Sequence, residues 1–135
     1  MSILELAMSQ LRHSYEICSA IDLKEYYSQE ELDDLEAFTS RFAHASDILI
    51  QKTLRCLDSM EFEDSGAVLD RIHRAEKRNF VIKDGDLIAV RQLRNKIAHE
   101  YIIDSPKIFH EEAILLSKVL FTVHSRLKDY IKKFE

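Results

Sequence analysis

One segment of eight residues places polar and ionisable side chains in the apolar stripe of a helix. It reads Arg94-Asn95-Lys96-Ile97-Ala98-His99-Glu100-Tyr101. At about 100° per residue, Arg94 falls within the stripe that is formed by Leu87, Val90, Leu93, Ile97 and Tyr101. Removing one partner of a buried ion pair costs about 3–5 kcal/mol. Arg94 therefore needs a carboxylate, a bound anion or a water-filled cleft beside it.

The other polar groups of this segment divide between two faces of the helix. Asn95 and His99 are four residues apart and share a face, whereas Arg94 and Tyr101 are seven apart and nearly eclipse each other. His99 follows Arg94 by five residues, about 140° around the helix. One helix therefore cannot simply point both side chains at one spot, and the small Ala98 leaves room for a ligand between the two pairs.

Basic residues gather just before and within this segment, although the net charge of the chain is −5. Residues 1–70 hold five basic and fifteen acidic side chains, residues 71–96 hold eight and three, and residues 97–135 hold six and six. The middle region could hold a polyanion through phosphate contacts, or it could be an ordinary solvated helix face. Its basic residues are Arg71, Arg74, Lys77, Arg78, Lys83, Arg91, Arg94 and Lys96.

The composition is that of a single helical domain over residues 1–135. With 46% hydrophobic and 32% charged residues, the chain can bury an ordinary core. Two glycines and one proline leave few places for tight turns, which argues against a β-rich fold. No apolar run approaches the roughly 18 residues of a membrane span, and the N-terminus lacks a signal-peptide pattern. We therefore expect a cytoplasmic protein without membrane contact.

Cysteines and histidines give no sign of a metal or another cofactor. Cys18 and Cys56 are far apart and lack CxxC spacing, so both are expected to be core thiols. Residues 110–114 begin as a zinc motif of the HExxH type, but Ile114 stands where the second histidine would be. We expect no cofactor and no catalytic metal.

Five helices are expected to position the segment. Apolar spacing and capping signals predict them over about residues 3–22, 29–58, 66–79, 85–103 and 106–134. The expected caps are Ser2 with Glu5, Ser28 with Glu31, Ser105 before Pro106, and Asp84 or Ser65 for the two middle helices. The first helix is expected to bury Ile3, Leu6, Ala7, Leu11, Tyr15 and Cys18. The predicted fold is an all-α, antiparallel up-and-down bundle of four main helices and one short helix.

The pattern Arg94-x4-His99-x-Tyr101, with Asn95 directly after the arginine, resembles the HEPN superfamily. Within it, the chain looks most like the HepT-type toxins, which are encoded beside a minimal nucleotidyltransferase antitoxin. The resemblance extends to the expected order of helices over the whole chain. It implies the toxin of a type II toxin-antitoxin system, a metal-independent endoribonuclease. It also implies a homodimer whose motif helices meet at one composite cleft. Arg94 and His99 would then come together across a two-fold axis, despite their 140° offset on one helix.

The resemblance also implies a role for each motif residue. The RNA 2′-hydroxyl would attack the adjacent phosphate, with His99 moving protons and Arg94 stabilising the charge on the phosphate. Asn95 would orient His99 or the phosphate. Tyr101 would be the residue that the antitoxin adenylylates to silence the toxin. The basic residues that we expect to contact RNA are Arg74, Lys77, Arg78 and Arg91.

Other interpretations stay open. Arg94 could be a structural arginine paired with a carboxylate of the second predicted helix, such as Asp47, and His99 an ordinary boundary histidine. Tyr101 could merely pack in the apolar stripe. The chain could then be a non-catalytic substrate-binding subunit of a nucleotidyltransferase, or a helical adaptor with a coincidental motif.

Overall fold

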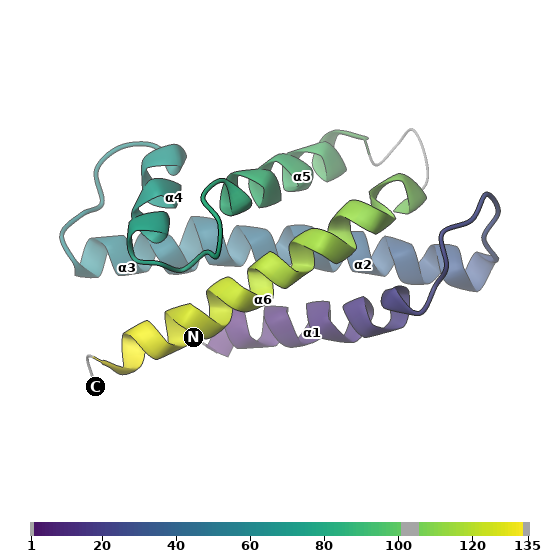
Figure 1. The fold of residues 1–135 in the computed structure, drawn as a ribbon, viewed down its shortest axis with the longest axis horizontal. Coiled ribbons are helices and arrows are strands. Elements are labelled where there is room, and N and C mark those ends of the chain that lie inside the picture. The colour runs from purple at the N-terminus through teal and green to yellow at the C-terminus, as the bar shows by residue number, and fades with distance from the viewer. Residues whose placement is uncertain (1, 101–105, 134–135) are drawn as a thin grey trace.

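All elements of the described structure are helices (Figure 1). The computed structural model describes residues 2–100 and 106–133. No strand occurs in these two ranges, which confirms the predicted all-α class. The elements are α1 (Ser2–Ser19), α2 (Gln29–Asp47), the π-helical turn η1 (Ile48–Thr53), α3 (Leu54–Met60), α4 (Val68–Lys77), α5 (Asp86–Glu100), the 3-10 turn η2 (Pro106–Phe109) and α6 (His110–Lys132).

The long helices run alternately in opposite directions. In Figure 1, α2, η1 and α3 form one continuous rod, α1 lies along it, and α6 crosses obliquely while contacting α1, α2 and α5. The short helix α4 lies at the end of the bundle beside α3. One core joins these elements, and its largest fully buried side chains include Leu11, Phe38, Phe42, Leu49, Phe80 and Leu93.

The start of α2 shows the predicted capping box. The Ser28 hydroxyl accepts a hydrogen bond from the Glu31 backbone N–H at 3.1 Å, and the Ser28 N–H donates to the Glu31 carboxylate at 2.9 Å. Together these bonds satisfy two backbone donors at the helix start. Neither Ser65 nor Asp84 is a cap, because α4 begins after Ala67 and α5 begins at Asp86.

Two further cap predictions reach residues that are only partly described. Ser2 is the first residue of α1, and its side chain lies outside the description. Ser105 lies outside the described residues as well. Beyond it, Pro106–Phe109 form a 3-10 turn, so the α-helical hydrogen bonding of α6 begins only at His110.

The buried face of α1 is rotated from the predicted one. Leu4 and Met8 are buried, together with the predicted Ala7, Leu11 and Cys18, whereas the side chains of Ile3 and Leu6 are 60% and 61% exposed. Residues spaced three and four apart define a helical face, and positions 4, 8 and 11 fit this rule as well as positions 3, 7 and 11 do. The sequence pattern alone therefore could not choose between the two faces.

The two cysteines differ in their surroundings. Cys18 is fully buried, as predicted, and its thiol donates to the Asp34 carbonyl oxygen at 3.4 Å. Burial raises the pKa of Cys18 to about 11. Cys56 is exposed, so its prediction as a core thiol was wrong. Its neighbours Leu54 and Leu57 face the core instead, which leaves Cys56 on the outer side of α3.

None of the helices in the described ranges is both long and apolar enough to cross a membrane.

Candidate functional site

Helix α5 buries the apolar stripe that the sequence predicted. Leu87, Val90 and Leu93 have no exposed surface, and Ile97 is 8% exposed. Arg94 follows Leu93 directly and lies at the edge of this buried face, with its side chain 35% exposed. The stripe therefore fixes the helix against the core while the guanidinium emerges at its border.

A carboxylate of α2 compensates the charge of Arg94. Arg94 Nε donates to Asp47 Oδ1 at 2.7 Å, and Arg94 Nη2 donates to Asp47 Oδ2 at 2.9 Å. This two-point hydrogen bond raises the pKa of Arg94 above its ordinary value and outweighs partial burial, which lowers it. The sequence-based requirement for a partner is confirmed, and the partner is the residue that the structural interpretation of Arg94 named.

Asp47 lies at the junction between α2 and the π-helical turn η1. It is the last residue of α2, and η1 begins immediately after it. At the end of η1, the Leu54 N–H donates to the Leu49 carbonyl oxygen five residues earlier, the spacing of a π-helix. Such turns occur frequently at functional sites. The wide turn keeps Ile48, Leu49 and Ile50 buried.

A cavity of about 400 Å³ lies between η1 and α5. Three of its charged residues are cationic and one is anionic, so its formal charge is positive. Asn95 also borders it and accepts a long hydrogen bond of 3.4 Å from Arg94 Nη1. The lining residues are Ser46, Asp47, Ile48, Ile50, Gln51, Lys52, Arg91, Arg94 and Asn95. A concave site with this charge and these donors is suited to an anion.

His99 does not line this cavity. It is exposed on α5, as is its neighbour Ala98. The separation agrees with the 140° offset expected on one helix. Tyr101 lies outside the described residues. Of the four motif residues, the described part of the chain therefore brings Arg94 and Asn95 to the cavity, whereas His99 lies outside its lining.

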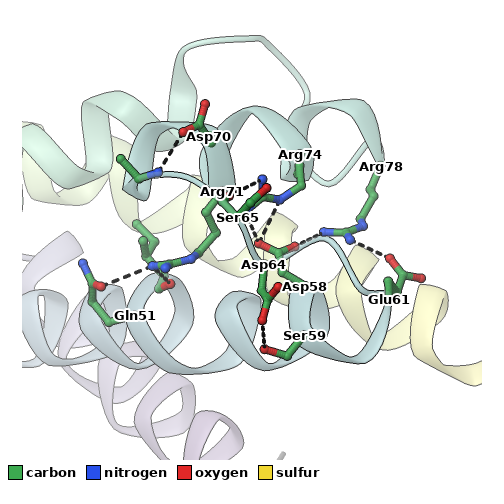
Figure 2. A network of polar contacts seen from close by, with 12 residues as sticks. Gln51, Asp58, Ser59, Glu61, Asp64, Ser65, Asp70, Arg71, Arg74 and Arg78 are labelled. Carbon is green, nitrogen blue, oxygen red and sulfur yellow. Dashed lines mark hydrogen bonds and ion pairs between the residues drawn. The ribbon is translucent and has the colours of Figure 1, made fainter.

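Two of the basic residues predicted to contact RNA belong to a separate ion-pair cluster, shown in Figure 2. Asp58 is 1% exposed and accepts from Arg74 Nε and Nη2 at 3.0 and 2.9 Å. Arg78 donates to Asp58 at 2.6 Å and to Glu61 at 2.5 Å. Burial lowers the pKa of Arg78, but these carboxylates outweigh it and the pKa is raised. The cluster fastens α4 to α3, a structural task for both arginines.

The remaining predicted RNA contacts lie in different places. Lys77 is exposed on α4 and borders a second cavity beside Arg74 and Arg78. Arg91 is half-buried on α5 and is the only one of the four predicted contacts that lines the cavity of Arg94. The predicted basic region thus contributes a structural cluster at α4 and a cationic wall at α5.

Sequence reasoning missed the contribution of η1 to the site. Gln51 and Lys52 line the cavity from that turn. In an α-helix, Lys52 would lie about 140° away from Asp47, because five residues separate them. The wider π-helical turn brings Lys52 closer to the side of Asp47 than an α-helix would, and both residues line the cavity. The sequence from Ile48 to Thr53 contains no glycine or proline that would signal this change.

No family model, curated protein or solved structure matches the chain. Within the described ranges, no three histidine, cysteine, aspartate or glutamate side chains gather so that they could hold a metal ion.

Proposed function

We propose that the chain is a metal-independent endoribonuclease in which Arg94 binds the scissile phosphate and His99 transfers protons. The supporting observation is the position of Arg94 in a positively charged cavity, at the edge of the core and not enclosed within it. The cavity has a volume of about 400 Å³, and Arg91 and Lys52 add positive charge to its lining. A ligand that enters this cavity reaches Arg94 directly.

The ion pair with Asp47 leaves Arg94 able to bind a phosphate. Asp47 engages Nε and one hydrogen of Nη2, and a guanidinium carries five N–H donors in a fixed fork. Among the described residues, both hydrogens of Nη1 and the second hydrogen of Nη2 remain for other acceptors, with only the long contact to Asn95 on Nη1. A phosphate can therefore bind across the Nη1–Nη2 edge while Asp47 stays in place.

The proposed reaction follows from these groups. The 2′-hydroxyl oxygen attacks the adjacent phosphorus as His99 removes its proton, and the bond from phosphorus to the 5′-oxygen breaks. The leaving 5′-oxygen takes up a proton, so the products are a 2′,3′-cyclic phosphate and a 5′-hydroxyl. Arg94 stabilises the charge that develops on the phosphate oxygens. DNA is not a substrate because it lacks the nucleophile.

A homodimer would complete the site. Arg94 and His99 diverge on one helix, and His99 is exposed outside the cavity. Two copies of α5 that meet about a two-fold axis would place His99 of one chain beside Arg94 of the other. Following the resemblance to HepT-type toxins, we propose that the protein is a toxin whose nucleotidyltransferase antitoxin adenylylates Tyr101. The added phosphate would compete with RNA for the cationic cleft.

The test is RNA cleavage by the purified protein in the presence of EDTA. We expect cleavage that leaves 2′,3′-cyclic phosphate ends, and a loss of about 10²-fold or more in Arg94→Ala and in His99→Ala. Lys96→Ala is the matched control, because Lys96 is exposed on the same helix and does not line the cavity. Circular dichroism should show that each variant keeps its helices. Full activity in either motif variant would refute the assigned roles.

One observation favours a second candidate, a non-catalytic subunit that binds the substrate of a nucleotidyltransferase. Asp47 already balances the charge of Arg94, as a purely structural pair would. This candidate predicts that the wild-type protein binds nucleic acid but leaves it uncleaved in the EDTA experiment.

A further inference from the structure

The cavity beside η1 is lined by two cations in addition to the ion pair of Arg94 and Asp47. Asp47 balances Arg94, which leaves Lys52 on η1 and Arg91 on α5 as the uncompensated charges of the lining. Neither makes an ion pair with any residue in the described ranges. Two unpaired cations across one concave surface attract a ligand with negative charge.

Two different elements bring these cations to the same cavity. Arg91 precedes Arg94 by three residues and therefore shares its face of α5. Lys52 lines the cavity from the π-helical turn that directly follows Asp47. The two cations thus come from η1 and from α5, and Arg94 on α5 lines the same cavity.

An uncharged donor adjoins the two cations. The Gln51 side-chain oxygen accepts a hydrogen bond from Arg71 Nη1 at 3.3 Å, and the same nitrogen donates to the Ile50 carbonyl oxygen at 3.2 Å (Figure 2). Arg71 therefore donates to the oxygen of the Gln51 amide, and the NH₂ group of Gln51 remains as a donor. Gln51 lines the cavity with Lys52, so this wall offers hydrogen-bond donors to an anion.

We propose that Lys52, Gln51 and Arg91 form a second phosphate subsite, which holds a backbone phosphate of RNA next to the one bound by Arg94. The identity of the ligand as RNA rests on the proposed function. The charge of the site and its donors point to a phosphodiester, since each such group carries one negative charge and two free oxygens. The subsite would fix the register of the strand and supply affinity without reading its bases.

A strand that cannot be cleaved separates this subsite from catalysis. The probe is a short fluorescent 2′-O-methyl oligoribonucleotide, which lacks the nucleophile and should bind without reacting. Its affinity is measured by anisotropy over a range of salt concentrations for the wild type, Lys52→Gln and Arg91→Gln. Lys132→Gln is the control, because it removes one exposed charge from the last residue of α6 and Lys132 does not line the cavity of Arg94. Lys52→Arg keeps the charge.

We expect Lys52→Gln and Arg91→Gln each to weaken binding and to reduce the slope of log K against log salt by about 0.7, the value for one lost contact to a single strand. Lys132→Gln and Lys52→Arg should bind like the wild type.

If ordinary RNA is bound but not cleaved, the nuclease proposal fails while this binding result still supports the subsite. Unchanged affinity and salt slope in both glutamine variants would overturn the subsite. A wild type that does not bind the probe would also overturn the subsite. An acidic segment of a protein partner would then be the ligand class that the positive cavity still fits.

Discussion

Arg94 lies at the edge of a buried apolar stripe, where its charge needs a partner. Its place in an apolar stripe predicted a compensating group, and Asp47 is that group. The choice between a structural and a functional arginine depends on which N–H donors remain free, and only side-chain geometry shows this. Asp47 occupies the Nε edge of the guanidinium and, among the described residues, leaves the Nη1–Nη2 edge available. The ion pair can therefore stabilise the site while Arg94 still binds a ligand.

Asp47 should therefore act as a positioning residue for Arg94. In Asp47→Asn, the guanidinium loses a charged partner on its Nε edge and can rotate away from the phosphate. We expect kcat for RNA cleavage to fall by up to about 10²-fold, while KM stays constant or decreases because a negative charge has left the cavity. The free energy of unfolding should change by less than about 1 kcal/mol, since the pair is partly exposed.

Steady-state kinetics and urea unfolding measure the two effects separately. Asp84→Asn is the control for Asp47→Asn, because Asp84 is exposed and does not line the cavity. A variant that kept its full kcat would show that Asp47 does not position Arg94.

The helices themselves were largely predictable, whereas their irregular junctions were not. Apolar spacing located the helices approximately, whereas of the predicted caps only the box at Ser28 and Glu31 is seen in the described residues. The π-helical turn η1 was missed because its residues continue the apolar pattern of α2. That turn carries Lys52 and Gln51 into the cavity, so the missed junction and the missed site residues have one cause.

A carboxylate on α4 ties the end of one element to the start of the next. Glu76 accepts from the Gly85 N–H at 2.7 Å, directly before α5, and also contacts His73 at 3.0 Å. The Gly85 hydrogen bond, with a further contribution from His73, holds the pKa of Glu76 below its ordinary value. Glu76 thereby links α4 to the helix that carries the motif.

The lowered pKa of Glu76 predicts how this link depends on pH. Because its folded-state pKa lies below the unfolded value of about 4.3, the stabilisation is complete above that value and disappears as the pH falls through the folded-state pKa. Glu76→Gln should lose about 1.5 kcal/mol of unfolding free energy at pH 7. The difference from the wild type should shrink below about pH 4. Urea unfolding at several pH values measures it, and a constant difference across that range would contradict the assignment.

The basic residues of the middle region have two different surroundings in the folded chain. Part of the basic middle region closes the bundle through Asp58, Arg74 and Arg78. Another part faces the cavity between η1 and α5. The sequence located the excess of positive charge but could not assign these tasks, because the acidic partners come from residues 16 to 47 positions away. One chain also leaves Arg94 and His99 on diverging faces, which is why the proposed site is shared between two chains.

Mixing the two motif variants tests whether one active site is shared between two chains. Arg94→Ala and His99→Ala are each purified, unfolded and refolded together, and RNA cleavage is measured in EDTA. A mixed dimer would contain one site with an intact Arg94 from one chain and an intact His99 from the other. We predict that the mixture recovers a substantial part of the wild-type activity while each variant refolded alone stays inactive. A mixture that forms mixed dimers and remains as inactive as its components would contradict a site shared between two chains.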